Sequence, residues 1–387
     1  QTVGYYSFDV PLANSIAVLG EEGTNDANGL YVERQSNPNL KWETSESFDL
    51  GLDASLFNNK LSLTADYFSK TTKGMIIPGL ADLHQGTAAA DVNGGEVKNT
   101  GWELALSYAG SVEDFSYNIF GNVSHIDNEL VNLDGYNSAG IDYIQHSDQV
   151  RGVLRPFRSA VGENLYSYYL VPAQGIFQSQ EEVEAYTHNG NLIQPNAQAG
   201  DLKFEDVNND GKINSEDRKF SGSYLPDFTY SFGFNFNYKN WDLNTLFQGV
   251  AGVKAFNAYK YSTYNASLQG YNLDNRVLGA WSPENTGSAI PRLATSDDNS
   301  NFGTNSTWYL ENASYLRLKN VTLGYTLPKT AMNRIFEGSS LRIYVSADNI
   351  FTITDYEGMD PEVGNNGLDI GKYPLSSKYV VGLSLSF

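Results

Sequence analysis

The segment 206–217 carries oxygen-bearing side chains at the spacing of a calcium-binding loop. Its sequence, DVNNDGKINSED, matches that pattern at positions 1, 3, 5, 6, 7, 8, 9 and 12. Calcium takes about six to eight oxygen ligands, and Gly211 permits the sharp turn that wraps them around the ion. The sequence therefore predicts a structural Ca²⁺ site whose ligands come from Asp206, Asn208, Asp210, Lys212 (through its backbone carbonyl), Asn214 and Asp217.

Two features of this segment depart from the calcium pattern. Asp217 stands where the pattern has a bidentate Glu, and its shorter side chain would hold an ion less completely. Flanking helices are not evident in the sequence. A turn rich in Asn, Asp and Gly that binds no metal would account for the same residues. Both interpretations stay open, and in either one the segment has a structural role.

Residue groupings that would support catalysis are not evident. The histidines are scattered, and none lies at metal-ligand spacing from another: His84, His125, His146 and His188. No G-x-S-x-G motif marks a nucleophile elbow between a strand and a helix. We therefore expect that the protein is not an enzyme.

The elements around this loop are predicted to be strands, and the last one is the most informative. In residues 378–387, KYVVGLSLSF, large apolar side chains alternate with a second set that is mostly small or polar. One face carries Tyr379, Val381, Leu383, Leu385 and Phe387. This alternation is typical of a strand between lipid and a water-filled lumen. An aromatic residue at the end of such a strand resembles the assembly signal of bacterial outer-membrane barrels.

The same alternation recurs along the chain. The clearest case is 228–238, where six aromatic residues share one face, a number that the core of a soluble sandwich rarely carries. Acidic residues such as Asp49, Asp53 and Asp66 occur singly on polar faces, as expected for a solvated lumen. We expect an all-β fold, a transmembrane antiparallel β-barrel with further strands within 48–56, 61–67, 102–108, 115–123, 241–247, 321–327 and 341–347.

The connections between these segments differ in length. Short links are expected at 57–60, 110–114 and 239–240, and long ones at about 71–97, 127–150, 172–225, 251–313 and 351–377. The two kinds alternate if one more strand pair lies between about 151 and 171, which brings the expected total to about eleven or twelve strands. Outer-membrane barrels have short periplasmic turns and long extracellular loops, so we expect the long connections outside the cell.

Composition agrees with this interpretation. The chain of 387 residues has 26 Tyr and 20 Phe, which suit interfacial girdles, and no cysteine, which excludes disulfides. Its net charge of −20 argues against a nucleic-acid partner, because phosphates require Lys and Arg. The segment 1–6 does not resemble a signal peptide. We therefore expect that 1–387 is the C-terminal part of a larger barrel domain.

Several segments, in the same order along the chain, resemble SusC-like TonB-dependent transporters of Bacteroidetes. They are NPNLKWE at 37–43, GDLKFEDVNNDGKIN at 200–214, WSPEN at 281–285, IPRL at 290–293, SYLRLKNVTLGYTLP at 314–328, VSADNIF at 345–351 and GMDPE at 358–362. The resemblance implies a barrel of about 22 strands in the outer membrane. It also implies an N-terminal plug, and we expect this chain to hold about half of the barrel and not the plug.

The resemblance further implies a function and partners. Such transporters import large nutrients, oligosaccharides or peptides, beneath a SusD-like surface lipoprotein that acts as a lid. TonB, with ExbB and ExbD, pulls on the plug, and two transporter–lipoprotein pairs often associate. The barrel contacts outer-membrane lipid, and no nucleic acid is implied. A lidless siderophore receptor and a soluble or surface-attached glycan-binding adhesin remain alternatives.

Two segments carry side chains suited to a ligand. The first is 251–313, with Tyr259, Tyr261, Tyr264, Tyr271, Trp281 and Trp308, although a large loop with its own small core is the expectation for each of them. The second contains Arg151, Arg155, Arg158, Tyr166, Tyr168 and Tyr169, which would line the lumen or mark an interface.

Overall fold

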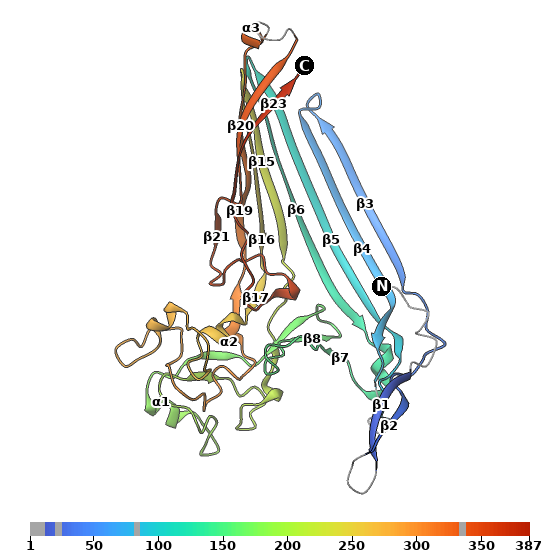
Figure 1. Cartoon of the computed structure of the whole chain (residues 1–387), viewed down its shortest axis with the longest axis vertical. Helices are drawn as coiled ribbons and strands as arrows, with labels where there is room; N and C mark the ends of the chain where they lie inside the picture. The colour runs from blue at the N-terminus through green and yellow to red at the C-terminus, as the bar shows by residue number, and fades with distance from the viewer. Residues whose placement is uncertain (1–11, 20–24, 81–85, 333–337) are drawn as a thin grey trace.

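A large antiparallel sheet dominates the computed structural model, which describes residues 12–19, 25–80, 86–332 and 338–387 (Figure 1). The short strand β21 (Thr352–Thr354) pairs with β19 (Tyr315–Thr326) beside the main order of strands. In spatial order the sheet consists of β3 (Thr44–Leu56), β4 (Leu61–Pro78), β5 (Asp91–Val112), β6 (Phe115–Asn132), β15 (Phe228–Tyr238), β16 (Trp241–Ala251), β19 (Tyr315–Thr326), β20 (Ser340–Asp348) and β23 (Lys378–Ser386).

The remaining elements are short and lie in the connections. A hairpin of β1 (Leu12–Leu19) and β2 (Asn25–Val32) precedes the sheet. One small sheet has the order β14 (Lys219–Phe220), β9 (Ser167–Leu170), β8 (Phe157–Ala160), β7 (Tyr143–Gln145). The others are β10 (Ala173–Ile176) with β13 (Leu202–Phe204), β11 (Thr187–His188) with β12 (Asn191–Leu192), and β18 (Leu310–Asn312), β17 (Lys254–Asn257), β22 (Leu368–Asp369).

Helices are few and short. The α-helices are α1 (Gln180–Ala185), α2 (Tyr259–Thr263) and α3 (Lys329–Met332). The 3₁₀ turns are η3 (Asp134–Ala139), η4 (Ser215–Asp217), η5 (Asn275–Gly279), η6 (Thr307–Tyr309) and η7 (Asn365–Gly367). Among the described residues, no helix has the length and apolar character needed to cross a membrane.

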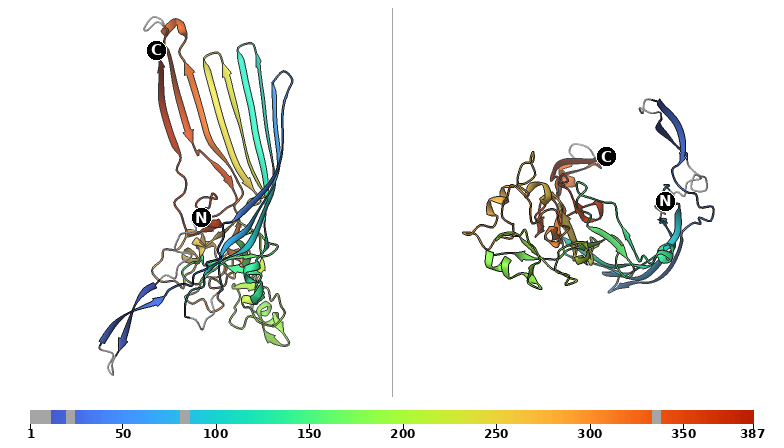
Figure 2. Two further views of the ribbon diagram at one scale, coloured as in Figure 1. Left: turned by 90° about the vertical axis from the view of Figure 1, so that its right-hand side faces the viewer. Right: turned by 90° about the horizontal axis from the view of Figure 1, so that it is seen from below.

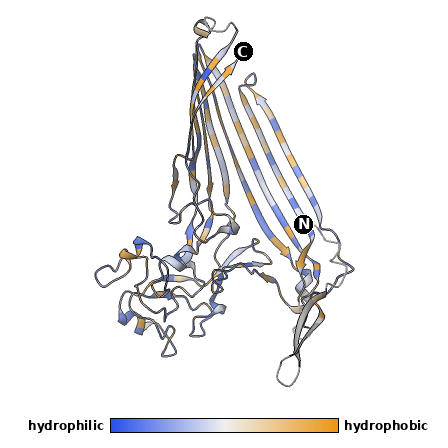
Figure 3. Ribbon diagram, viewed as in Figure 1, coloured by the Kyte–Doolittle hydropathy of each residue, from blue (hydrophilic) through white to orange (hydrophobic). Residues whose placement is uncertain are grey.

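The two faces of the large sheet follow the alternation of the sequence (Figure 3). On the last strand, Tyr379, Val381 and Leu383 are at least 70% exposed, as expected for side chains that contact lipid. Antiparallel pairing sets like faces side by side: Phe232 lies opposite Phe247, and the two rings stack with centroids 4.8 Å apart. The expected outward apolar and inward polar faces are therefore confirmed.

The expected strand segments are all confirmed, but the expected strand count is wrong. The sheet has nine strands in its main order within the described residues, not eleven or twelve. Residues 151–171 do not add a pair to it, because β8 and β9 are only four residues each and belong to the small sheet. The adjoining expected loops, 127–150 and 172–225, are consequently parts of a single connection, 133–227.

Connections still alternate between the two ends of the sheet without the extra pair, since a pair leaves the parity unchanged. The links 57–60, 113–114, 239–240 and 327–339 lie at one end of the sheet, and 79–90, 133–227, 252–314 and 349–377 lie at the other (Figure 1). The expected loop 71–97 is shorter than predicted, because β4 and β5 extend into it to Pro78 and from Asp91. The alternation of lengths is confirmed except at 327–339, whose 13 residues exceed the 12 residues of 79–90.

The main buried core of the chain lies in the long connections and not between two layers of the sheet. Its fully buried side chains include Phe157 and Tyr168 from the small sheet and Phe256 and Tyr309 from 252–314. The connections therefore form a folded body at one end of the sheet.

The large sheet is open at both sides. Viewed along its strands, it forms an arc with β3 at one edge and β23 at the other, and in the described residues these edges do not pair with each other (Figure 2). Unpaired backbone groups are not tolerated in lipid, so each edge requires a partner strand. The expectation that 1–387 is one part of a barrel domain stays a prediction, and residues 1–6 lie outside the described ranges.

Candidate functional site

The segment 206–217 forms a tight loop whose side chains turn inward to its own backbone. The carboxylate of Asp206 accepts hydrogen bonds from the backbone N–H groups of Asp210 (3.1 Å) and Gly211 (2.8 Å). Asn208 Oδ1 also accepts from Asp210 N (3.0 Å), and Asp210 Oδ1 accepts from Lys212 N (2.9 Å). Gly211 has a φ of 83°, so the glycine is used for the sharp turn as the sequence predicted.

Asp217 stabilises this loop through hydrogen bonds to its backbone. It is completely buried, and its two oxygens accept from Val207 N (2.9 Å) and Asn214 N (2.7 Å). Asn214 caps the 3₁₀ turn η4 through Glu216 N (2.7 Å). Within the described residues, no three His, Cys, Asp or Glu side chains gather as a metal site. The loop retains side-chain oxygens suited to Ca²⁺, and the calcium site stays a prediction.

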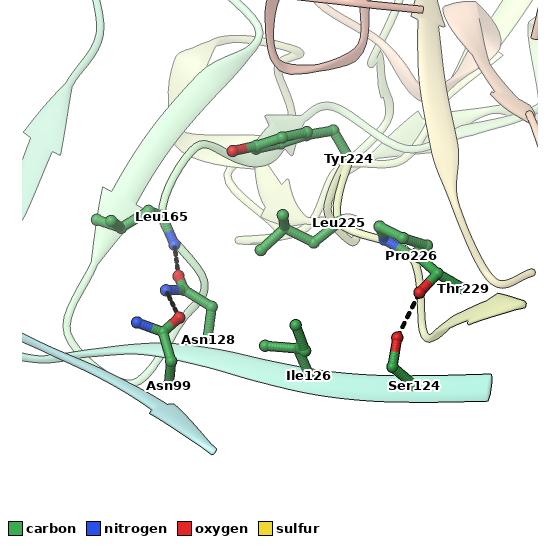
Figure 4. A pocket seen from close by; sticks show the side chains of 9 residues that line it. All are labelled: Asn99, Ser124, Ile126, Asn128, Leu165, Tyr224, Leu225, Pro226 and Thr229. Carbon is green, nitrogen blue, oxygen red and sulfur yellow. Dashed lines mark hydrogen bonds between the residues drawn. The ribbon is translucent and has the colours of Figure 1, made fainter. Parts of the chain in front are cut away.

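A cavity of about 350 Å³ lies on the inner face of the large sheet, where the strands meet the connections (Figure 4). Its walls are mainly apolar and come from Ile126 on β6 and from Leu165 and Leu225 in the connection 133–227. Asn128 forms two hydrogen bonds at the edge of the cavity. Its Nδ2 donates to Asn99 Oδ1 (2.8 Å), and its Oδ1 accepts from Leu165 N (2.9 Å). The sequence did not identify this cavity, because its lining residues are up to 130 positions apart, from Asn99 to Thr229.

The aromatic residues of 251–313 mostly build a core, as expected. Tyr261 and Tyr264 are buried, and Trp308 packs against the same cluster. Trp281 packs on the separate cluster around Leu202. Tyr271 is the exposed exception, and its ring lies under the guanidinium of Arg151, 4.4 Å from centroid to Cζ.

Buried ion pairs hold the connections together. Lys260 Nζ lies 2.6 Å from Glu311 Oε1, and Arg292 Nε lies 2.7 Å from Asp201 Oδ1. Asp201 is completely buried and also accepts from Asn301 Nδ2 (2.9 Å). Opposite charges at these distances in a poorly solvated region stabilise one arrangement of the segments, because separating them would leave a buried charge unpaired.

The arginines and tyrosines of 151–169 separate into two groups. Tyr168 is buried, and its hydroxyl donates to Lys254 O (3.0 Å). Arg158 instead lies between the rings of Tyr143 (4.0 Å) and Tyr169 (3.8 Å) on the other face of the small sheet. The sequence analysis did not single out Tyr143 or Arg218. Both residues come close to Arg158 only through the pairing of the short strands.

The histidines do not form a common site among the described residues. His125 Nδ1 lies 2.6 Å from Asp227 O, and His146 Nε2 lies 2.6 Å from Ser159 Oγ. His146 also stacks on Tyr166, with centroids 3.7 Å apart. Burial lowers the pKa of His146, and Asp148 opposes this shift. His188 lies against Gly211, and His84 lies outside the described residues.

Comparison with known proteins agrees with this architecture. Residues 4–350 match the family described as TonB dependent receptor-like, beta-barrel. The chain belongs to that family. As part of such a barrel it resides in the bacterial outer membrane. The inner face of its large sheet is accordingly the lumen side, and the outer face contacts lipid.

Individual family members are similar over nearly the whole chain. TonB-dependent receptor P3 of Formosa agariphila is 32% identical over 97% of this chain and 37% of the relative. TonB-dependent receptor SusC of Bacteroides thetaiotaomicron is 27% identical over 91% of this chain and 32% of the relative. The chain thus spans about a third of the length of these relatives.

A solved structure gives the same result. The RagAB peptide transporter is 26% identical, and the match covers 100% of this chain and 39% of the solved chain, with a TM-score of 0.76. The same importer in its open-open state matches with a TM-score of 0.77. The described strands and connections therefore have counterparts in a TonB-dependent barrel, and the resemblance inferred from the sequence is confirmed.

Proposed function

We propose that this chain forms the C-terminal wall of a TonB-dependent importer of large nutrients, either oligosaccharides or peptides. One observation carries the proposal: the sheet has an apolar outer face and a polar inner face, and three of its long connections, 133–227, 252–314 and 349–377, share one buried core at a single end. Such a body at the mouth of a barrel offers a large surface to cargo. The proposed role is transport and not catalysis.

The proposed partners follow from the same family. A SusD-like lipoprotein would cover the end of the barrel that carries the long connections, and TonB with ExbB and ExbD would act on a plug encoded outside this chain. The open edges at β3 and β23 support a larger barrel, because each needs a neighbouring strand. The similarity to the RagAB peptide transporter favours peptide cargo, and the similarity to SusC keeps open the oligosaccharide cargo that the SusC-like resemblance implies.

Gentle detergent extraction of native outer membranes, followed by purification and mass spectrometry, tests the proposal. We expect a lipoprotein of the SusD type in stoichiometric amount, and retained peptides or sugars that identify the cargo. A barrel that purifies alone and binds an iron chelate would instead support the lidless siderophore receptor. Recovery of the protein in the soluble fraction would refute the importer.

A further inference from the structure

The described arginines differ in whether they form an ion pair with a carboxylate. Five of the nine described arginines contact a carboxylate within 4.0 Å. The other four form no ion pair with any described residue, although the chain carries a net charge of −20. They are Arg151, Arg155, Arg158 and Arg218.

Two of these arginines share one face of the small sheet. Arg158 on β8 lies opposite Gln145 on β7 and Ser167 on β9, so Tyr143, Gln145 and Tyr169 are on its face. Phe220 on β14 pairs with Tyr169, and Arg218 precedes it by two residues with extended backbone angles. The other face, with Phe157 and Tyr168, is buried in the core. We call Tyr143, Arg158, Tyr169 and Arg218 the arginine patch.

Arg158 is held in place with donors to spare. Its guanidinium lies between two tyrosine rings. The rings cover the flat faces of the guanidinium and do not occupy the N–H donors along its edge. Nε and one terminal nitrogen point to the same oxygen of Gln145, at 3.3 Å each. A guanidinium has five N–H donors, so most of the edge remains available.

Arg218 lacks the partner that its position requires. Its Nε is buried without a hydrogen-bond acceptor among the described residues. Burial lowers its pKa, and the positive charge of Arg158 lowers it further. The adjacent Asp217 cannot relieve this, because both of its oxygens accept backbone N–H groups of the loop. A buried donor without an acceptor is costly, so the patch is suited to an anion.

The arginine patch is attached to the lumen side of the barrel wall. In the turn between β8 and β9, Gly162 N donates a hydrogen bond to Leu130 O on β6 (2.9 Å). Leu130 N in turn donates to Glu163 O (2.9 Å). Leu165 in the same turn lines the cavity on the inner face of the sheet. Cargo that passes from the connections into the lumen would therefore pass close to the small sheet that carries the patch.

We propose that the arginine patch binds a carboxylate of the imported cargo. This proposal rests on the proposed function and narrows it. Two neighbouring guanidinium groups beside aromatic rings select acidic cargo over neutral cargo of the same size. The carboxylate comes either from an acidic peptide or from a uronic-acid oligosaccharide, and the two sources are separated by the probes.

The test is binding to the complete transporter with its partner subunit, by isothermal titration. The probes are an acetylated and amidated peptide of alternating Gly and Glu, its Gly and Gln counterpart, tetragalacturonate, and tetragalacturonate methyl ester. We expect one acidic probe to bind about tenfold more tightly than its neutral counterpart. Arg158→Gln and Arg218→Gln should each remove that preference, and Arg158→Lys should restore only part of it.

Lys239→Gln is the matched control, because it removes the same charge from the short turn at the opposite end of the sheet. It should keep the preference. Equal binding of acidic and neutral probes by the unaltered protein would overturn the proposal, and so would equal weakening of both probes in the arginine variants. Uptake of cargo without acid preference would leave the importer intact, whereas a transporter that takes up no cargo would refute the proposed function itself.

Discussion

Arg342 on β20 reaches across the intervening strand β19 to Asp242 on β16, with Nε 2.8 Å from Oδ1. The two side chains meet above Gly324, where a Cβ atom would lie 2.3 Å from Asp242 Oδ1 and 2.5 Å from an Arg342 nitrogen. The absence of a side chain at this position is what allows an ion pair to span three strands on the inner face. The pair therefore fixes the register of strands that are far apart in the sequence.

We predict that Gly324→Ala destabilises the barrel. The added methyl group must push the ion pair apart, and crowding of this kind costs about 1–3 kcal/mol. Thermal unfolding in detergent, followed by the shift between folded and unfolded bands on gels, measures the effect. Gly287→Ala is the control, because a Cβ there meets nothing within 4 Å and its φ is not in the left-handed region. Equal melting temperatures for both variants would contradict this account.

The two faces of β23 should respond oppositely to a charge. Leu383→Lys places an ammonium on the lipid face, where the cost is about 2–4 kcal/mol near the bilayer centre. Ser384→Lys, one position along the same strand, points to the lumen and should be tolerated. Folding into lipid vesicles under urea measures both free energies. A similar loss in the two variants would show that the assignment of faces is wrong.

Calcium should stabilise the loop 206–217. With calcium at about 100 times its dissociation constant, the expected stabilisation is about 2.7 kcal/mol. Tyr186, whose hydroxyl oxygen lies 3.3 Å from Asp206 N, should sensitise the luminescence of terbium bound in the loop. A double substitution, Asp206→Asn with Asp210→Asn, should abolish the luminescence, whereas Asp298→Asn should not. Calcium-independent melting together with absent terbium emission would favour the metal-free turn.

Acid should loosen the connection 133–227 through His146. Because burial lowers the folded pKa of His146, the unfolded state binds the proton more readily, so stability falls as the pH drops below the unfolded value of about 6.5. Asp148 faces the ring and reduces this effect. Proteolysis of the connection at pH 7.5 and 5.5 measures it. His146→Gln should reduce the difference, and an unchanged pH response in that variant would exclude His146 as the cause.

The strands of the barrel wall, and the face of each strand that contacts lipid, could be predicted from the amino-acid sequence alone. This succeeded because alternation has a period of two residues and is a local property: Leu383 and Ser384 can be assigned to opposite faces without knowing any partner strand. The short links at 57–60, 113–114 and 239–240 were equally readable, since a short link depends only on the distance between two strands along the chain. The calcium-loop pattern was readable too, although its metal remains to be tested.

The fold of the long connections could not be predicted from the sequence, because it depends on contacts between distant segments. A pair of wall strands was expected within 151–171, but Phe157 and Tyr168 are buried in the core of the connections, and the short strands there belong to the small sheet. The arginine patch depends on the pairing of β14, β9, β8 and β7, so Arg218 could not be linked to Arg158 from the sequence. Contacts between distant segments depend on how all of them pack together, and that information is not contained in any local pattern.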